Sequence, residues 1–265
     1  MKVYLMTDME GVSGVINAID WVYRDSLYYE IGKELLTKEV NAAVDGFFAA
    51  GADEVIVHDG HGKGGINIRM LDPRAKMQRG WVGPYPCGLN ETYDVIAWVG
   101  QHPKSQTEYG HICHTGDFDV LRDEVNGIAV GEFGHMVFLS QLYNVVPIFA
   151  SGCVAFTKEA QEMVKGIETV AVKEGLMPGS GDECTTEQYR DRNFAAIHVQ
   201  PETARKMIRD GAERALRRYW SNPESFCRLQ TVSPPYSRRV MYRDGRVEDY
   251  VGDDLVAVMN EKENK

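Results

Sequence analysis

The segment Val3-Tyr4-Leu5-Met6-Thr7-Asp8-Met9-Glu10 joins a short apolar run to a pair of acidic residues. A run of this length that is followed by polar residues and glycines is typical of a buried β-strand that ends in a loop. Residues two apart on an extended segment point to the same side, so both carboxylates can face one cation. Acids beside a buried strand need a partner that offsets their desolvation. A pair that only caps a helix or fills a loop is the alternative.

The same arrangement recurs twice further along the chain. Residues 54–58 (EVIVH) predict a second strand, which runs into a glycine-rich loop that contains His61. Residues 94–100 (DVIAWVG) predict a third strand, which ends at His102. Ligands of parallel sheets bind outside the carboxyl ends of the strands. We therefore expect Asp8, Glu10 and these two histidines to lie at the same edge of one sheet.

Helical patterns alternate with the predicted strands. Apolar residues from Leu27 to Phe48 recur at helical spacing after a capping residue, Asp25 or Ser26, and Gly51 follows as the residue that ends this helix. Further helices are predicted over residues 132–143, 157–165 and 201–220. Further strands are predicted over residues 127–129, 146–150 and 168–173. This alternation predicts an α/β fold of three layers, in which helices flank a mainly parallel sheet.

The remainder of the chain shows little periodicity. Residues 176–191 look like a long loop, and the segment after the last helix contains Pro234-Pro235. We expect an α/β core over residues 1–220 and a small C-terminal subdomain over residues 221–265.

Composition excludes several classes of protein. The chain has 265 residues with 29 basic and 39 acidic side chains, a net charge of −10, and 43% hydrophobic residues, which are globular values. An acidic chain is a poor partner for nucleic acid or anionic membranes. No apolar run approaches the roughly 18 residues of a membrane span, and the N-terminal apolar run is too short for a secretory signal. Five cysteines without a C-x-x-C pair favour reduced thiols in the cytoplasm.

Five of the seven histidines lie between residues 58 and 114, and histidine is the commonest metal ligand. His111 and His114 lie in a glycine-flanked loop, where Cys113 also raises the question of a cysteine–histidine pair, although sequence neighbours rarely form one. The loop Gly60-x-Gly62-x-x-Gly65 formally matches a dinucleotide fingerprint but lacks the long helix and the acid that should follow. Its Lys63 faces either solvent or a substrate.

Glu132 adds a third acid, at the start of a predicted helix, where a favourable dipole interaction is the alternative explanation. Together Asp8, Glu10, His61, His102 and Glu132 supply oxygen and nitrogen ligands, which suit zinc or manganese. Five ligands exceed the needs of one four-coordinate zinc ion. If all five converge, two metal ions bridged by a carboxylate fit better, and a water held between them would lose its proton near neutral pH.

Five segments in order resemble the zinc-dependent D-aminopeptidases of the M55 peptidase family: DMEGVSG (8–14), DGHGKG (59–64), GQHPKS (100–105), GHICHTG (110–116) and VGEFG (130–134). The resemblance covers roughly residues 1–173. It implies two zinc ions per subunit, ligated by the five residues above, with Asp8 as the bridge. It also implies that His114 is the catalytic histidine that binds no metal. It further implies homo-oligomers that enclose the active sites, for example as a ring, and cleavage of peptides with N-terminal D-residues.

Three departures from the family pattern leave substrate choice and oligomer geometry open. Cys153 follows Ser151-Gly152 where relatives often carry an acid, the loop over 176–191 is longer, and the segment after Pro234 is shorter. We expect a cytoplasmic binuclear zinc aminopeptidase that acts on short peptides through a metal-activated water, with His114 assisting. Lys173 is a further candidate for assistance, and another divalent metal could replace zinc. The alternatives are a binuclear hydrolase of another amide or a phosphoester, and a non-catalytic protein that binds metal or peptide.

Overall fold

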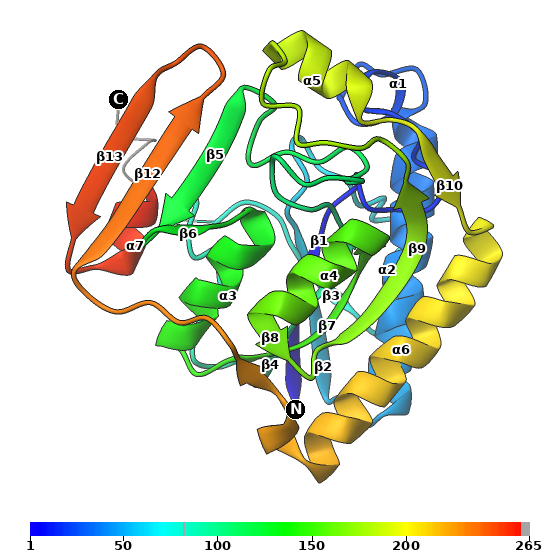
Figure 1. Cartoon of the computed structure of the whole chain (residues 1–265). Coiled ribbons are helices and arrows are strands. Elements are labelled where there is room, and N and C mark those ends of the chain that lie inside the picture. Colours follow the sequence, from blue (N-terminus) through cyan, green and yellow to red (C-terminus); the bar gives the residue numbers. More distant parts are fainter. Residues whose placement is uncertain (82, 261–265) are drawn as a thin grey trace.

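The computed structural model describes residues 1–81 and 83–260 and has a seven-stranded sheet at its centre (Figure 1). The strand order is β10-β9-β7-β4-β1-β2-β3, and every neighbouring pair is parallel except β10 with β9. The strands are β1 (Lys2–Thr7), β2 (Glu54–Asp59), β3 (Lys76–Gln78), β4 (Val95–Gln101), β7 (Val146–Cys153), β9 (Glu168–Gly175) and β10 (Ala196–His198). The predicted mainly parallel sheet is confirmed.

Helices cover both faces of this sheet, as Figure 1 shows. On one face lie α2 (Tyr29–Ala49) and α6 (Pro201–Ser221), and on the other α3 (Glu132–Leu142) and α4 (Val154–Met163). Strand β1 separates two apolar cores: Val3 and Leu5 belong to the core under α2 and α6, whereas Tyr4 and Met6 belong to the core under α3 and α4. Burial on both faces explains why this strand is a continuous apolar run.

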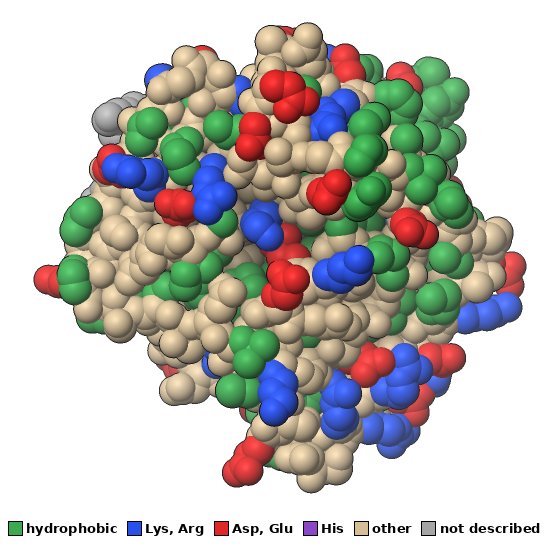
Figure 2. Space-filling model, in the orientation of Figure 1, with side chains coloured by type: hydrophobic (Ala, Val, Ile, Leu, Met, Phe, Trp, Pro, Cys, Tyr) green, Lys and Arg blue, Asp and Glu red, His purple; other side chains and the backbone are tan. Residues whose placement is uncertain are grey.

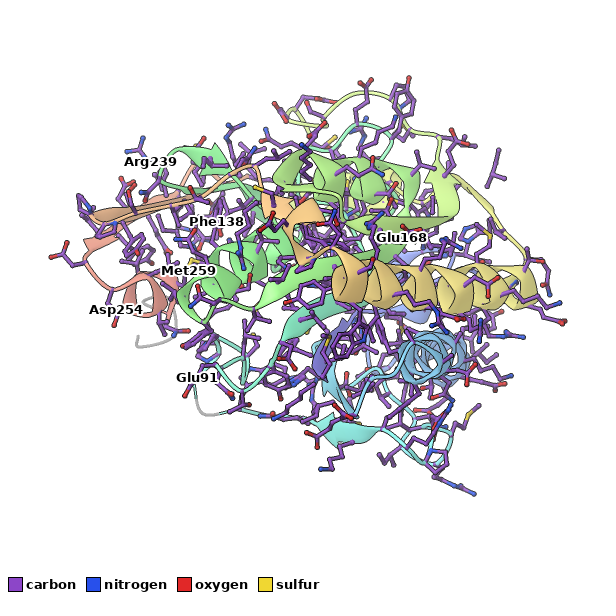
Figure 3. The ribbon with its side chains drawn as sticks, turned by 90° about the horizontal axis from the view of Figure 1, so that it is seen from below. Glu91, Phe138, Glu168, Arg239, Asp254 and Met259 are labelled. Carbon is purple, nitrogen blue, oxygen red and sulfur yellow. The ribbon has the colours of Figure 1, made fainter. Side chains whose placement is uncertain are left out.

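A second, antiparallel sheet stands beside the first. Its order is β13-β12-β5-β6, formed by β5 (Val120–Val125), β6 (Ile128–Ala129), β12 (Tyr236–Tyr242) and β13 (Val247–Gly252). Helix α7 (Leu255–Asn260) packs against it, and Met259 shares a buried core with Phe138 of α3 (Figure 3). The C-terminal strands therefore pair with β5, which lies far earlier in the chain. The boundary expected at residue 220 stays a prediction.

The long loop expected over residues 176–191 does not extend to its predicted end. Helix α5 (Thr186–Arg192) begins inside it, because Thr185 and Gln188 form a reciprocal capping box. That spacing is present in the sequence and predicts a helix start. The remaining short elements are α1 (Ala18–Trp21), a 3-10 turn (Pro223–Ser225), and the pair β8 (Val164–Lys165) and β11 (Cys227–Arg228).

The start of α2 differs from the prediction. The helix begins at Tyr29 without a side-chain cap, because the Ser26 hydroxyl instead donates to the Ile19 carbonyl in the preceding turn. Leu27 and Ile31 are consequently 77% and 50% exposed and do not belong to the buried face of the helix. The other end agrees with the prediction, since Gly51 follows the helix with a φ of +93°.

The exposed face of α6 carries charged side chains of both signs. Basic and acidic side chains are mixed over α6 (Figure 2). Arg209 pairs with Glu213 of the same helix, and both Arg214 and Arg218 pair with Glu168, which is labelled in Figure 3. The charged side chains of this helix face are therefore largely paired with one another and with Glu168. None of the helices in residues 1–81 and 83–260 is long and apolar enough to cross a membrane.

Candidate metal centre

Three adjacent strands carry the predicted ligands to one edge of the sheet. Asp8 directly follows β1, His102 directly follows β4, and His61 comes two residues after β2. The loops after β1 and β4 approach so closely that side chains are excluded between them. A Cβ at Gly100, where φ is +78°, would lie 2.1 Å from the Asp8 carbonyl oxygen, and a Cβ at Gly11 would lie 2.2 Å from that of Gln101.

The first cluster of candidate ligands consists of Asp8, Glu10 and His61, whose ligand atoms all lie within 4.8 Å of one another. The His61 Nδ1 atom is 3.0 Å from Asp8 Oδ1 and 3.2 Å from Glu10 Oε2. Its other nitrogen, Nε2, donates to the Val22 carbonyl at 2.9 Å. That backbone contact fixes the ring so that Nδ1 faces the carboxylates, as the hydrogen bond from the second ring nitrogen does in metal-bound histidines.

The second cluster consists of His102, His114 and Glu132, again within 4.8 Å. The His102 Nε2 atom lies 3.5 Å from Glu132 Oε1, while Nδ1 donates to the Pro103 carbonyl at 3.0 Å. Glu132 is the first residue of α3 and accepts a hydrogen bond from the Gly116 amide at 2.9 Å. Its side chain is one-third exposed, the most accessible of the six.

Asp8 connects the two clusters. Its Oδ1 atom faces His61 at 3.0 Å, and its Oδ2 atom faces His102 at 3.2 Å. Each carboxylate oxygen therefore points at a different histidine, which is the arrangement a bridging carboxylate requires. Gln101 Nε2 donates to Oδ2 at 3.0 Å and steadies this orientation. Gln101 was missed in the sequence, although it immediately precedes His102 in the third predicted strand-end segment.

The carboxylates and imidazoles of the site are buried close together, and each shifts the pKa of its neighbours. Burial alone would raise the pKa of Asp8, but the nearby rings of His102 and His61 lower it far below its usual range. Burial likewise acts against the charge on Glu132, yet His102 lowers its pKa to about 2. Burial would lower the pKa of His61 and His102, whereas the adjacent carboxylates raise both. Protons on these rings thus balance the carboxylates when no cation is bound.

His114 differs from the other two histidines of the site. Its ring stacks on that of His102, with centroids 3.9 Å apart, and on that of Phe118 at 4.5 Å. Nδ1 donates to the Ile112 carbonyl at 3.0 Å, which leaves Nε2 unprotonated and 4.0 Å from Glu132 Oε1. Burial and the positive charge on His102 lower the pKa of His114. The ring is therefore a neutral base at neutral pH.

Two cationic side chains donate hydrogen bonds to the backbone of the loops that carry the first cluster. The ammonium of Lys173, which is 2% exposed, donates to the carbonyls of Glu10, Val12 and Val15. The guanidinium of Arg79 donates to the carbonyls of Asp59, His61 and Gly62. Lys173 therefore supports the backbone of the Glu10 loop, and its ammonium is engaged by three carbonyls instead of being free to assist catalysis directly.

The remaining histidines of the predicted group are structural. His58 lies 3.0 Å from the Tyr93 hydroxyl and stacks on Tyr4, and His111 contacts the carbonyls of Ile16 and Phe194. Cys113 lies 3.2 Å from the Tyr189 hydroxyl, and burial raises the pKa of its thiol to about 11. That value disfavours the thiolate, so a cysteine–histidine nucleophile is not supported.

The donor set fits a divalent cation. His102 Nε2 is completely buried and makes no well-directed hydrogen bond, although it faces two carboxylates. Buried polar atoms normally have a partner, so an unsatisfied one aimed at carboxylates favours a bound ion there. Three carboxylates and two imidazoles are ligands that zinc accepts. The clusters border a cavity of about 520 Å³ with apolar walls that include Trp81, Trp98 and Met136.

Comparison with known proteins agrees with this geometry. A family model described as D-aminopeptidase, an M55 peptidase, matches residues 1–251. A D-aminopeptidase of Bacillus subtilis (strain 168) is 32% identical over 179 residues, and the match covers 66% of this chain and 65% of the relative, less than two thirds of its length. A solved structure of Zn-dependent D-aminopeptidase DppA from Bacillus subtilis, described as a self-compartmentalizing protease, has a TM-score of 0.83 at 23% identity. That likeness covers 97% of this chain and 93% of the other, and it establishes the fold.

Proposed function

The chain belongs to the D-aminopeptidase family, since the family model spans residues 1–251, and we propose that it is a binuclear zinc aminopeptidase of short peptides with N-terminal D-residues. The observation that carries this proposal is the position of Asp8 between two clusters of candidate ligands. The curated relative and the solved structure are both D-aminopeptidases, and the latter is described as zinc-dependent.

In this proposal Asp8, Glu10 and His61 would hold one zinc ion, and Asp8, His102 and Glu132 the other. His61 would bind through Nδ1 and His102 through Nε2, because the other nitrogen of each ring donates to a backbone carbonyl. When bound, zinc supplies Lewis-acid chemistry: it lowers the pKa of a coordinated water and polarises a carbonyl.

His114 acts as the acid–base residue. Its unprotonated Nε2 lies at the edge of the second cluster and takes a proton during attack on the scissile carbonyl, then returns it to the leaving amine. The hydrogen bond from Nδ1 to the Ile112 carbonyl holds the tautomer that this role needs. The His114 ring is stacked between the rings of His102 and Phe118, which restricts its rotation.

We further propose that the chain works as a homo-oligomer, for example a closed ring, in the cytoplasm. The solved structure that it resembles is described as self-compartmentalizing. Hydrophobic side chains gather over α1 and β10 in Figure 2, where Ile19 and Ile197 are 48% and 61% exposed, and such a patch suits contact between subunits. Five cysteines without a disulfide agree with a reducing compartment.

Two measurements test the proposal together. Metal analysis of the purified chain should give two zinc ions per subunit, and matched D-alanyl and L-alanyl peptides should show chelator-sensitive cleavage of the D-form. Cleavage of nitrophenyl phosphate in place of both peptides would identify a phosphoesterase on the same residues. Metal binding without hydrolysis of any of these compounds would identify a non-catalytic protein.

A further inference from the structure

Two basic side chains line the cavity beside the metal centre, Arg24 and Lys63. Both are exposed, and they are the only Lys or Arg residues among the described residues that line it. Every other charged side chain of the lining is acidic or belongs to the histidines of the centre; the acids are Asp8, Glu10, Asp117 and Glu132. Asp8 and Glu10 are buried and belong to the metal centre, whereas the exposed charged side chains of the lining are Arg24, Lys63 and Asp117.

Neither cation has a partner of its own within the part of the chain that the structure describes. No hydrogen bond or ion pair involves the side chain of Arg24 or of Lys63 among residues 1–81 and 83–260. Most arginines elsewhere are engaged, for example Arg79 by the carbonyls of the loop that carries Lys63, and Arg74 by Asp45 and Asp72. In a chain of net charge −10, two unpaired cations beside one cavity are available to an external anion.

The positions of the two cations relative to the first cluster follow from the chain itself. Lys63 is two residues after His61, and Arg24 is two residues after Val22, whose carbonyl accepts from His61 Nε2. Two residues span at most about 7 Å between Cα atoms. Both side chains thus start within a short distance of the proposed zinc ligand His61, on separate segments of the chain. Arg79 fixes the loop of Lys63 through the carbonyls of Asp59 and His61.

We propose that Arg24 and Lys63 form a subsite for the C-terminal carboxylate of the peptide, so that the preferred substrates are di- and tripeptides with a free C-terminus. This inference rests on the proposed aminopeptidase function, which places the N-terminal residue of the peptide at the metal centre. An extended peptide spans about 3.4 Å per residue, so a carboxylate two or three residues away lies about 7 to 10 Å further on. Arginine and lysine are the side chains that bind carboxylates by charge-assisted hydrogen bonds.

Such a subsite adds a selection by peptide length to what the metal ligands recognise. The metal centre recognises features that every peptide N-terminus shares. A longer peptide would place neutral backbone between Arg24 and Lys63 and leave both cations unpaired. The apolar walls, which include Trp81 and Trp98, are suited to the side chains of the peptide and not to its charged end.

The experiment compares a D-alanyl dipeptide that has a free C-terminal carboxylate with the same dipeptide as its C-terminal amide. For the zinc-loaded chain we expect kcat/KM for the acid to exceed that for the amide by about 10- to 100-fold, mostly through KM, since each charge-assisted contact contributes about tenfold. Arg24→Gln and Lys63→Met should each lower kcat/KM for the acid by about tenfold, and the double variant should remove the preference.

Two control variants remove exposed cations that do not line the cavity, Arg69→Gln and Lys165→Met. They should keep the wild-type ratio of acid to amide. Equal cleavage of acid and amide by the wild-type chain would overturn the subsite while leaving the aminopeptidase function standing. If the double variant still preferred the acid over the amide, the subsite would likewise be overturned and the aminopeptidase function would stand. Absence of cleavage of either peptide by the zinc-loaded chain would overturn the proposed function, and the subsite with it.

Discussion

The two halves of the metal centre are built in different ways. Around Asp8, Glu10 and His61 the side chains are nearly fully buried, and cations hold the loops from behind. Around His102 and Glu132 the ring of His102 stacks on that of His114, and the Glu132 carboxylate is one-third exposed.

This difference separates two tasks. Ligands held by buried contacts keep their geometry before a metal ion arrives, which favours tight binding. More exposed groups can contact a bound peptide and can exchange a proton with it during cleavage. We infer that the ligands of the first half mainly hold metal, whereas Glu132 and His114, the two most exposed side chains of the centre, also meet the reacting part of the substrate. Substitutions in each half, at the residue that joins them, and at the side chains that support their loops should therefore have different effects.

The largest effect is expected where the halves meet. Asp8→Ala removes the carboxylate that faces both His61 and His102, so zinc should be lost from both halves and peptide cleavage should fall to background. Zinc content by atomic emission and kcat/KM on a D-alanyl peptide measure this. Asp253→Ala, which removes an exposed carboxylate outside the site, is the matched control. Unchanged zinc content in Asp8→Ala would disprove the bridging role.

The next effect distinguishes chemistry from metal binding in the second half. His114→Gln should keep the zinc content and lower kcat by about 10²- to 10⁴-fold, the usual contribution of a general acid–base group. KM should change little, because the ring binds no metal in this proposal. Retention of full kcat together with full zinc content would exclude the proposed role of His114.

A smaller effect is expected from the support of the first half. Lys173→Met keeps the bulk of the side chain but leaves the carbonyls of Glu10, Val12 and Val15 without their donor. Loss of such supporting contacts typically weakens metal affinity by about 10- to 100-fold. Competition titration with a zinc chelator measures the dissociation constant, and Lys165→Met is the control. An unchanged zinc affinity would show that the loop holds its shape without the ammonium.

The smallest effect concerns stability alone. Glu39 accepts a hydrogen bond from the Ser13 amide beneath the same loop, and burial raises its pKa to about 8 despite the nearby charges of Lys173 and Arg205. This pKa is raised above the unfolded value of 4.5, so the folded chain holds the Glu39 proton more tightly than the unfolded chain does. The contribution of the protonated carboxyl to stability is therefore fully present below pH 4.5 and is lost as pH rises towards 8.

Glu39→Gln cannot lose a proton, so its melting temperature should gain on that of the wild type as pH rises from 6 to 8. The difference between the free energies of unfolding of the two chains should change by at most about 1.4 kcal/mol per pH unit. Thermal melts at several pH values measure it, with Glu202→Gln on the exposed surface as the control. Parallel melting curves of Glu39→Gln and the wild type would show that Glu39 is ionised in the folded chain throughout this range.

The candidate ligands could be predicted because each lies next to a strong local pattern. The runs that end at Asp8, His61 and His102 are buried strands, and parallel neighbours necessarily bring their carboxyl ends to one edge. The strand over 120–125 was missed because Arg122 and Glu124 interrupt its apolar residues. Its longest pairing is with β12, which comes more than 100 residues later in the chain.

The sequence by itself determined the layered α/β fold and the types of ligand at the strand ends, since both follow from periodicity and from the order of neighbours along the chain. Only the tertiary structure decided what surrounds those ligands. The three carbonyls around Lys173, the two histidines that face Asp8, and the lining of one cavity by both Arg24 and Lys63 bring together residues that are far apart in sequence. No local pattern encodes such contacts, because they depend on how whole elements pack.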